Sequence, residues 1–168
     1  DTATELDRTS KTASKIGIAS EKLAGLQSAA SQTGVSNETL SKGLTNLARR
    51  TSEAADGTGE AVGALKKLGI TASRLKELKP EEQFREVAKA LGSITNQSDK
   101  PSIAFDLCGR GGNDLINTLD LGAGGLNKMQ KEAEKLGLAI SGDKLKRVEA
   151  FNDAIDKLGK LVGGITNK

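Results

Sequence analysis

The sequence predicts an all-α fold, a compact bundle of short capped helices flanked by a heptad-patterned helix at each end. Three observations predict it. Apolar residues recur at spacings of three and four along most of the chain, and no segment alternates apolar and polar residues for long enough to form a strand. A glycine, an apolar residue and then a serine or threonine recur where the helical pattern stops. We divide the 168 residues into an N-terminal heptad helix over 1–33, a compact module over 34–142 and a C-terminal heptad helix over 143–168.

The first segment carries an apolar stripe with alternating spacings of three and four, as in a heptad pattern. Alanine and threonine make up half of the stripe, so a lone helix here would gain little from burial and needs a partner helix. The stripe consists of Leu6, Thr9, Ala13, Ile16, Ala19, Leu23, Leu26 and Ala30.

Four glycines of the central segment are predicted to lie just past helix ends: Gly34, Gly69, Gly109 and Gly137. A residue without a Cβ adopts the left-handed conformation required there without a steric penalty. Ser36 follows Gly34 and offers its hydroxyl as the N-cap of the next helix. The sequence therefore divides residues 34–142 into short helices.

The C-terminal segment has the strongest periodicity in the chain. Its seam predicts a helix that associates with other helices, most simply with copies of itself. Gly159, Gly163 and Gly164 lie in or beside it and would weaken an isolated helix. The predicted association residues are Val148, Phe151, Ile155, Leu158, Val162 and Ile165.

Composition excludes several classes of protein. The chain has no histidine, which removes the commonest general base and metal ligand. Aromatic residues make up only 2 % of the chain, so its core must consist mainly of Leu, Ile, Val and Ala. No apolar run approaches the length that spans a bilayer, so we expect no membrane segment in this piece. The 25 lysine and arginine residues are interspersed with 22 aspartate and glutamate residues, so we predict no specific nucleic-acid partner. The pI near 9.0 leaves a helical nucleic-acid-binding domain as a further alternative.

The stretch "FDLCGRGGNDL" (105–115) could be a phosphate-binding loop or a bend between helices. It lacks the lysine and hydroxyl residue of a P-loop, and Asp114 stands where a dinucleotide fingerprint needs glycine. We interpret it as a bend, with Gly109 as C-cap, Asn113 as the next N-cap and Arg110 exposed and bonded to helix-end carbonyls or a nearby carboxylate. Cys108 has no histidine to activate it and is predicted to be a buried thiol. We predict no catalytic, cofactor or metal site, and therefore no enzyme.

Several motifs, in their order, resemble a module of tail tape measure proteins of long-tailed bacteriophages and prophages. They are "LGITASRLKELKPEEQFREVAKALGSI", "IAFDLCGRGGNDLINTL", "AEKLGLAIS" and "VEAFNDAIDKL", and the resemblance covers about residues 34–158. One departure is Cys108, which stands where such modules usually have an aromatic residue before the Gly-Arg pair.

The resemblance implies a long helical structural protein that sets the length of the tail. It would be made in the host cytoplasm, lie in the lumen of the virion tail and leave ahead of the DNA during ejection. It also implies the tail tube, the tail assembly chaperone and tail tip proteins as partners. The alternative is a helical interaction module of a cytosolic scaffold or signalling protein. The chain starts at Asp1 and ends inside a helical pattern, so we expect a piece of a longer protein.

Overall fold

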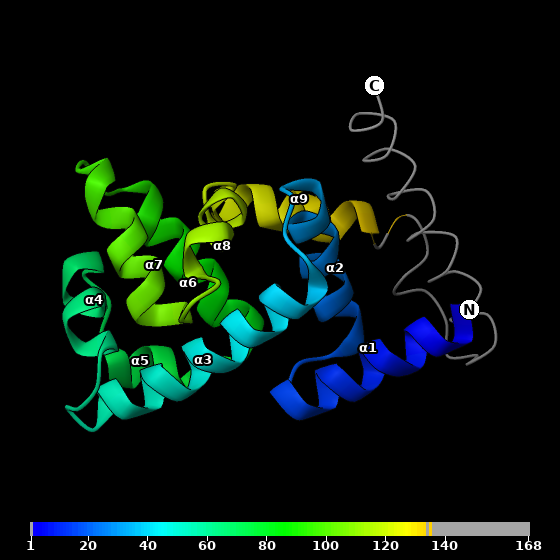
Figure 1. The fold of residues 1–168 in the computed structure, drawn as a ribbon, viewed down its shortest axis with the longest axis horizontal. Coiled ribbons are helices and arrows are strands. Elements are labelled where there is room, and N and C mark those ends of the chain that lie inside the picture. Colours follow the sequence, from blue (N-terminus) through cyan, green and yellow to red (C-terminus); the bar gives the residue numbers. More distant parts are fainter. Residues whose placement is uncertain (1, 134, 136–168) are drawn as a thin grey trace.

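The structure is a computed structural model that describes residues 2–133 and residue 135. Within these residues every regular element is a helix and no strand occurs, so the predicted all-α class is confirmed (Figure 1). The elements are α1 Thr2–Ile16, α2 Ser20–Gln32, α3 Asn37–Ala55, α4 Ala61–Leu68, α5 Ala72–Glu77, α6 Pro80–Gly92, the 3₁₀ turn η1 Gln97–Asp99, α7 Lys100–Cys108, α8 Gly112–Leu119 and α9 Gly122–Ala133.

The prediction of one continuous helix over residues 1–33 is wrong. Gly17 has φ +83°, and the amides of Gly17 and Ile18 both donate to the carbonyl of Ala13, at 2.9 and 3.0 Å. The chain therefore leaves the helix, and Ile18 turns into the core, where it is 6 % exposed. The apolar stripe ran through this break because Gly17 lies between two of its positions. This joint uses a glycine followed by an apolar residue, as the later joints do.

The helix α2 is not a free flank, because it shares the core with the helices that follow. Leu23 and Leu26 are buried, and α2 packs against α9 and α3 (Figure 1). The side-chain amide of Gln130 on α9 donates to the carbonyl of Glu21 at 3.2 Å. Segments about a hundred residues apart in sequence are thereby joined.

Two of the predicted glycine joints share one hydrogen-bond pattern. Gly34 and Gly69 have φ of +81° and +70°. After α2, Val35 N donates to Ala30 O at 2.7 Å, and after α4, Ile70 N donates to Leu65 O at 2.9 Å. These bonds satisfy carbonyls that a helix end would leave unpaired. The Oγ of Ser36 accepts from Thr39 N at 3.1 Å, so the predicted N-cap of α3 is confirmed.

The core lies where α3 and α6 meet the helices packed around them. Phe84 on α6 is fully buried, whereas Phe105 on α7 is 49 % exposed, so the described core depends on aliphatic side chains, as the composition predicts. Each buried leucine contributes about 1.5–3 kcal/mol. The fully buried leucines are Leu23, Leu40, Leu44, Leu47, Leu65, Leu75, Leu91, Leu107, Leu115 and Leu119.

The predicted C-terminal helix over 143–168, its six association residues and the predicted cap at Gly137 lie outside the described residues.

Candidate functional site

The glycine bend between α7 and α8 allows two helices to approach each other closely. Gly109 has φ +82°, and its carbonyl accepts from Gly112 N at 2.9 Å. A Cβ on Gly112 would overlap the backbone of Ala104, lying 2.5 Å from its carbonyl carbon and 2.9 Å from Phe105 N. A Cβ on Gly111 would lie 2.7 Å from Cγ2 of Thr39. The close contacts at both positions therefore explain why Gly111 and Gly112 carry no side chain.

The predicted N-cap at Asn113 is wrong. Helix α8 begins one residue earlier, at Gly112, and its N-cap is Gly111, which has no side chain to bond the first amides. The close approach to α7 fixes the start of α8 at the glycine pair, so Asn113 is already inside the helix.

Arg50 on α3, and not Arg110, supplies the cation at the C-terminal end of α7. Its Nη1 donates to the carbonyls of Phe105 and Asp106 at 2.7 and 2.9 Å and pairs with Glu60 at 3.0 Å. The Arg50 side chain is only 14 % exposed, whereas Glu60, the residue before α4, is 59 % exposed. This contact therefore joins α3, α7 and the start of α4 at the edge of the core.

Arg110 is exposed in the turn, as predicted, but it makes no hydrogen bond or ion pair within the described residues. The predicted contact with helix-end carbonyls is therefore wrong. Asn46, also on α3, donates from Nδ2 to the carbonyl of Cys108 at 2.9 Å and occupies the space beside Gly109. Together, Asn46 and Arg50 bond three carbonyls at the C-terminal end of α7, those of Phe105, Asp106 and Cys108.

Cys108 is a buried free thiol at the end of α7. Burial raises the pKa of this thiol from 9.0 to about 12, and the nearby positive charge of Arg50 opposes only part of that shift. The reactive thiolate is therefore scarce at neutral pH, and Cys108 acts as a small apolar side chain.

Within residues 2–133 no cluster of three His, Cys, Asp or Glu side chains could hold a metal ion. No helix in that part of the chain is both long enough and apolar enough to cross a bilayer.

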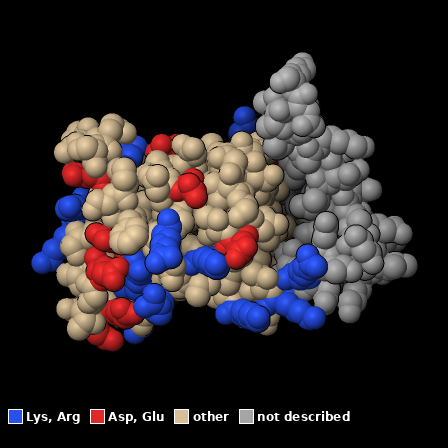
Figure 2. All heavy atoms as spheres, in the orientation of Figure 1, with Lys and Arg blue, Asp and Glu red and all other residues tan. Residues whose placement is uncertain are grey.

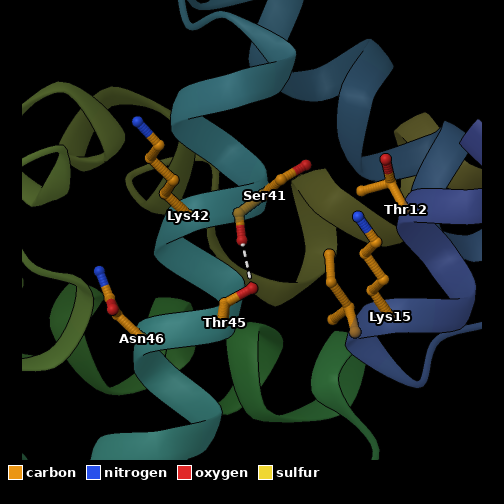
Figure 3. Close-up of a pocket in the computed structure, with 7 residues that line it drawn as sticks. Thr12, Lys15, Ser41, Lys42, Thr45 and Asn46 are labelled. Carbon is orange, nitrogen blue, oxygen red and sulfur yellow. Dashed lines mark hydrogen bonds between the residues drawn. The ribbon is translucent and has the colours of Figure 1, made fainter. Parts of the chain in front are cut away.

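A groove lies between α1 and α3, and polar side chains of both helices line it. It encloses about 360 Å³ (Figure 3). Helix α1 contributes Thr12, Lys15 and Ile16, and α3 contributes Ser41, Lys42, Thr45 and Asn46. Ile16 is half-buried and packs against the core, so the groove has an apolar floor below its polar rim.

The polar groups on the two walls differ in how they are engaged. Figure 3 shows Lys15 extending from α1 toward α3, with Ser41 on the facing side of α3, whereas Lys42 points away from α1. The Thr45 hydroxyl donates to the carbonyl of Ser41 at 2.9 Å, so it is already used within α3. Lys42 pairs with Glu38 at 3.0 Å, but both side chains are more than 70 % exposed (72 % and 77 %). Such a pair contributes little and can exchange partners.

Basic side chains are exposed on α1 beside the groove. Figure 2 shows lysine and arginine side chains along the described part of this helix. Arg8, Lys11 and Lys15 are exposed on this helix. The sequence interpretation missed this surface because it searched for a basic run, whereas the signal is a spacing of three and four within one helix.

A second hollow, of about 440 Å³, lies between the C-terminal ends of α4 and α6 and the loop before α7. Lys66 and Lys67 on one side and Asp99 on the other give it mixed charge. It favours neither an anion nor a cation.

Comparison with known proteins identifies no relative: the chain has no significant match to a protein-family model, a curated protein or a solved structure.

Proposed function

We propose that this chain is a structural module of a tail tape measure protein of a long-tailed bacteriophage or prophage, acting in tail length determination, tail assembly and DNA ejection. Such a module contributes length and packing, and it needs no catalytic group. The sequence resemblance carries the proposal.

One observation supports it: the motifs of the resemblance coincide with structural joints. "LGIT" forms the turn from α4 into α5, "KPEEQF" begins α6 at Pro80, and "CGRGG" forms the tight passage from α7 to α8. The buried thiol of Cys108 and the bonding of Asn46 and Arg50 to helix-end carbonyls give the third motif a packing role. These motifs therefore specify how helices are joined, which suits a structural protein.

We further propose that residues 34–142 form a capped helical module whose core α2 completes, and that the segment 143–168 associates with copies of itself through its apolar seam. Seam residues such as Phe151 and Ile155 would each contribute about 1.5–3 kcal/mol when buried against a partner. That gain would offset the glycines in the seam, which each cost a helix about 1 kcal/mol. The tail tube, the assembly chaperone and the tail tip are the proposed protein partners, and the tail lumen is the proposed location.

Mass spectrometry and protease protection of purified tail particles test the location. Peptides of this chain should be found in tails purified from the lysate. They should resist added protease while the tail holds its contents and become accessible after ejection is triggered. Peptides present only in the soluble host fraction would contradict the proposal and favour a cytosolic interaction module.

Sedimentation equilibrium tests the self-association separately. The apparent molecular mass of the intact chain should rise with protein concentration. The Ile155→Asp variant should remain monomeric, because burying a charge in an apolar seam carries a large free-energy cost. A strictly monomeric intact chain would reject self-association and leave the tail assignment untouched.

A further inference from the structure

We propose that residues 2–32 are a two-state element, in which the bend at Gly17 opens so that α1 and α2 become one continuous helix. The structure shows the bent state (Figure 1). In the straight state α1 leaves its place beside α3, and the groove between these two helices no longer exists. The inference does not rest on the tape measure assignment, because it uses only the geometry of the bend and the packing on each side of it.

The bend depends on the backbone conformation of one residue. Gly17 has φ +83°, and a Cβ at this position would meet no atom within 4 Å, so glycine is needed there for its conformation and not for space. The next helix begins without a side-chain cap, because Ala19 at the N-cap position makes no such bond. Residues 2–32 contain no proline, so every amide of the bend can take part in a continuous helix.

Few buried side chains hold α1 against the rest of the molecule. Among its described side chains, only Ala13 is buried, and Ile16 is half-buried. The main contacts of α1 are with α2 and α3, and Figure 1 shows its N-terminal half extending beyond the other described helices. Opening the bend therefore removes little of the described apolar surface of α1 from the core.

Ile18 is the residue that favours the bent state. Its side chain is 6 % exposed, and its amide donates to the carbonyl of Ala13 at 3.0 Å. Two residues along a helix correspond to a rotation of about 200°, so in a continuous helix Ile18 would face away from Ile16 and the apolar stripe. The burial of Ile18 is lost when the bend opens, which makes the bent state the more populated one.

The apolar stripe favours the straight state when another helix covers it. The stripe keeps its spacings of three and four through the bend, so a continuous helix of about 45 Å has both halves of the stripe on one face. The α2 half stays in the core through Leu23 and Leu26, and the α1 half extends from the same face. A helix that packs on this extension binds the straight state better than the bent one and shifts the population toward it.

Gly17→Ala should shift the equilibrium toward the straight state without any partner. Alanine is disfavoured in the left-handed conformation of the bend and is favoured over glycine inside a helix. Together these two effects should raise the ratio of straight to bent molecules by about 30- to 150-fold. Ile18→Ser should shift the ratio in the same direction by a second route, because it removes the buried side chain and leaves residue 17 unchanged.

The test is a distance measurement by pulsed electron paramagnetic resonance on the full chain. Spin labels are attached through Ser10→Cys and Ser31→Cys, two exposed positions, in a Cys108→Ala background that has no other thiol. The labelled protein is diluted with unlabelled protein, so that only distances within one chain are measured. The labelled positions are about 32 Å apart along a continuous helix, and any bend brings them closer.

We expect the parent protein to show mainly the short distance and each single variant to show a second population near 32 Å. In the Gly17→Ala/Ile18→Ser double variant the long distance should be the major one. The matched control is Gly69→Ala, the same change at φ +70° with no atom within 4 Å of the new Cβ. Leu65 and Leu75 are buried on either side of that joint, so the control should lose stability and keep the short distance between the labels.

Three outcomes would overturn the proposal. The double variant could show only the short distance of the parent protein. It could show a broad distribution with a loss of helical circular dichroism, which would mean that α1 has unfolded and not joined α2. The third is a long distance that appears equally in the Gly69→Ala control. The Cα chemical shifts of residues 17–19 are a second readout, because they should become helical in every variant that shows the long distance.

Discussion

Gly112→Ala tests the close contact between α7 and α8. The added Cβ would overlap the backbone of Ala104, 2.5 Å from its carbonyl carbon, and no flexible side chain can move out of the way. Helix α8 must shift, which disturbs the burial of Leu115 and Leu119, both 0 % exposed. Overpacking of this kind costs about 1–3 kcal/mol. We therefore expect the free energy of unfolding to fall by about that amount.

Gly63→Ala is the matched control, because it makes the same chemical change at an exposed position inside α4 where nothing lies within 4 Å of the new Cβ. Alanine is the better helix former, so this variant should gain about 0.5–1 kcal/mol. The chain has no Trp or Tyr, so urea unfolding is best followed by circular dichroism at helical wavelengths. A Gly112→Ala protein as stable as the wild type would refute the reasoning.

Three further predictions concern single residues at or near helix ends. Arg50→Ala should lower the free energy of unfolding by about 1.5–3 kcal/mol, because it removes charged hydrogen bonds to two helix-end carbonyls. Arg110→Ala should change it by less than about 0.5 kcal/mol. Equal effects of the two variants in urea unfolding would contradict this assignment. Gly69→Val should lower the free energy of unfolding by about 1–2 kcal/mol, since a β-branched residue would be forced to φ +70°. An unchanged midpoint of urea unfolding would show that this backbone geometry is not needed. Burial raises the pKa of the Cys108 thiol from 9.0 to about 12, so between these pH values the folded state keeps a proton that the unfolded state loses. The free energy of unfolding should therefore fall as the pH rises from 9 toward 12, by up to about 1.4 kcal/mol per pH unit. A Cys108→Ala protein with the same pH dependence would exclude this cause.

The sequence was sufficient where one residue determines the local geometry. Gly34 and Gly69 were predictable because a residue that must turn left-handed after a helix favours glycine, and the apolar residue that follows marks the turn. Pro80 likewise marks the start of α6, since its fixed φ and missing amide hydrogen suit a first helical turn.

The sequence was insufficient where two distant segments decide the outcome. Arg50 reaches the end of α7 from 55 residues away, and nothing in its neighbourhood on α3 indicates that target. Gly112 looks like any turn glycine until α7 is placed against it. The groove between α1 and α3 exists only because the chain breaks at Gly17, and that break was concealed by an apolar stripe that continues through it.

The most direct test of the central proposal is the length of tails assembled with altered copies of this module, measured by electron microscopy. An in-frame deletion of the segment that encodes residues 34–142 should shorten the tails, and a tandem duplication should lengthen them. The upper limit is about 1.5 Å for each residue removed or added, the rise of a continuous helix. Tails of unchanged length in both variants would contradict the assignment of this chain to a tape measure protein.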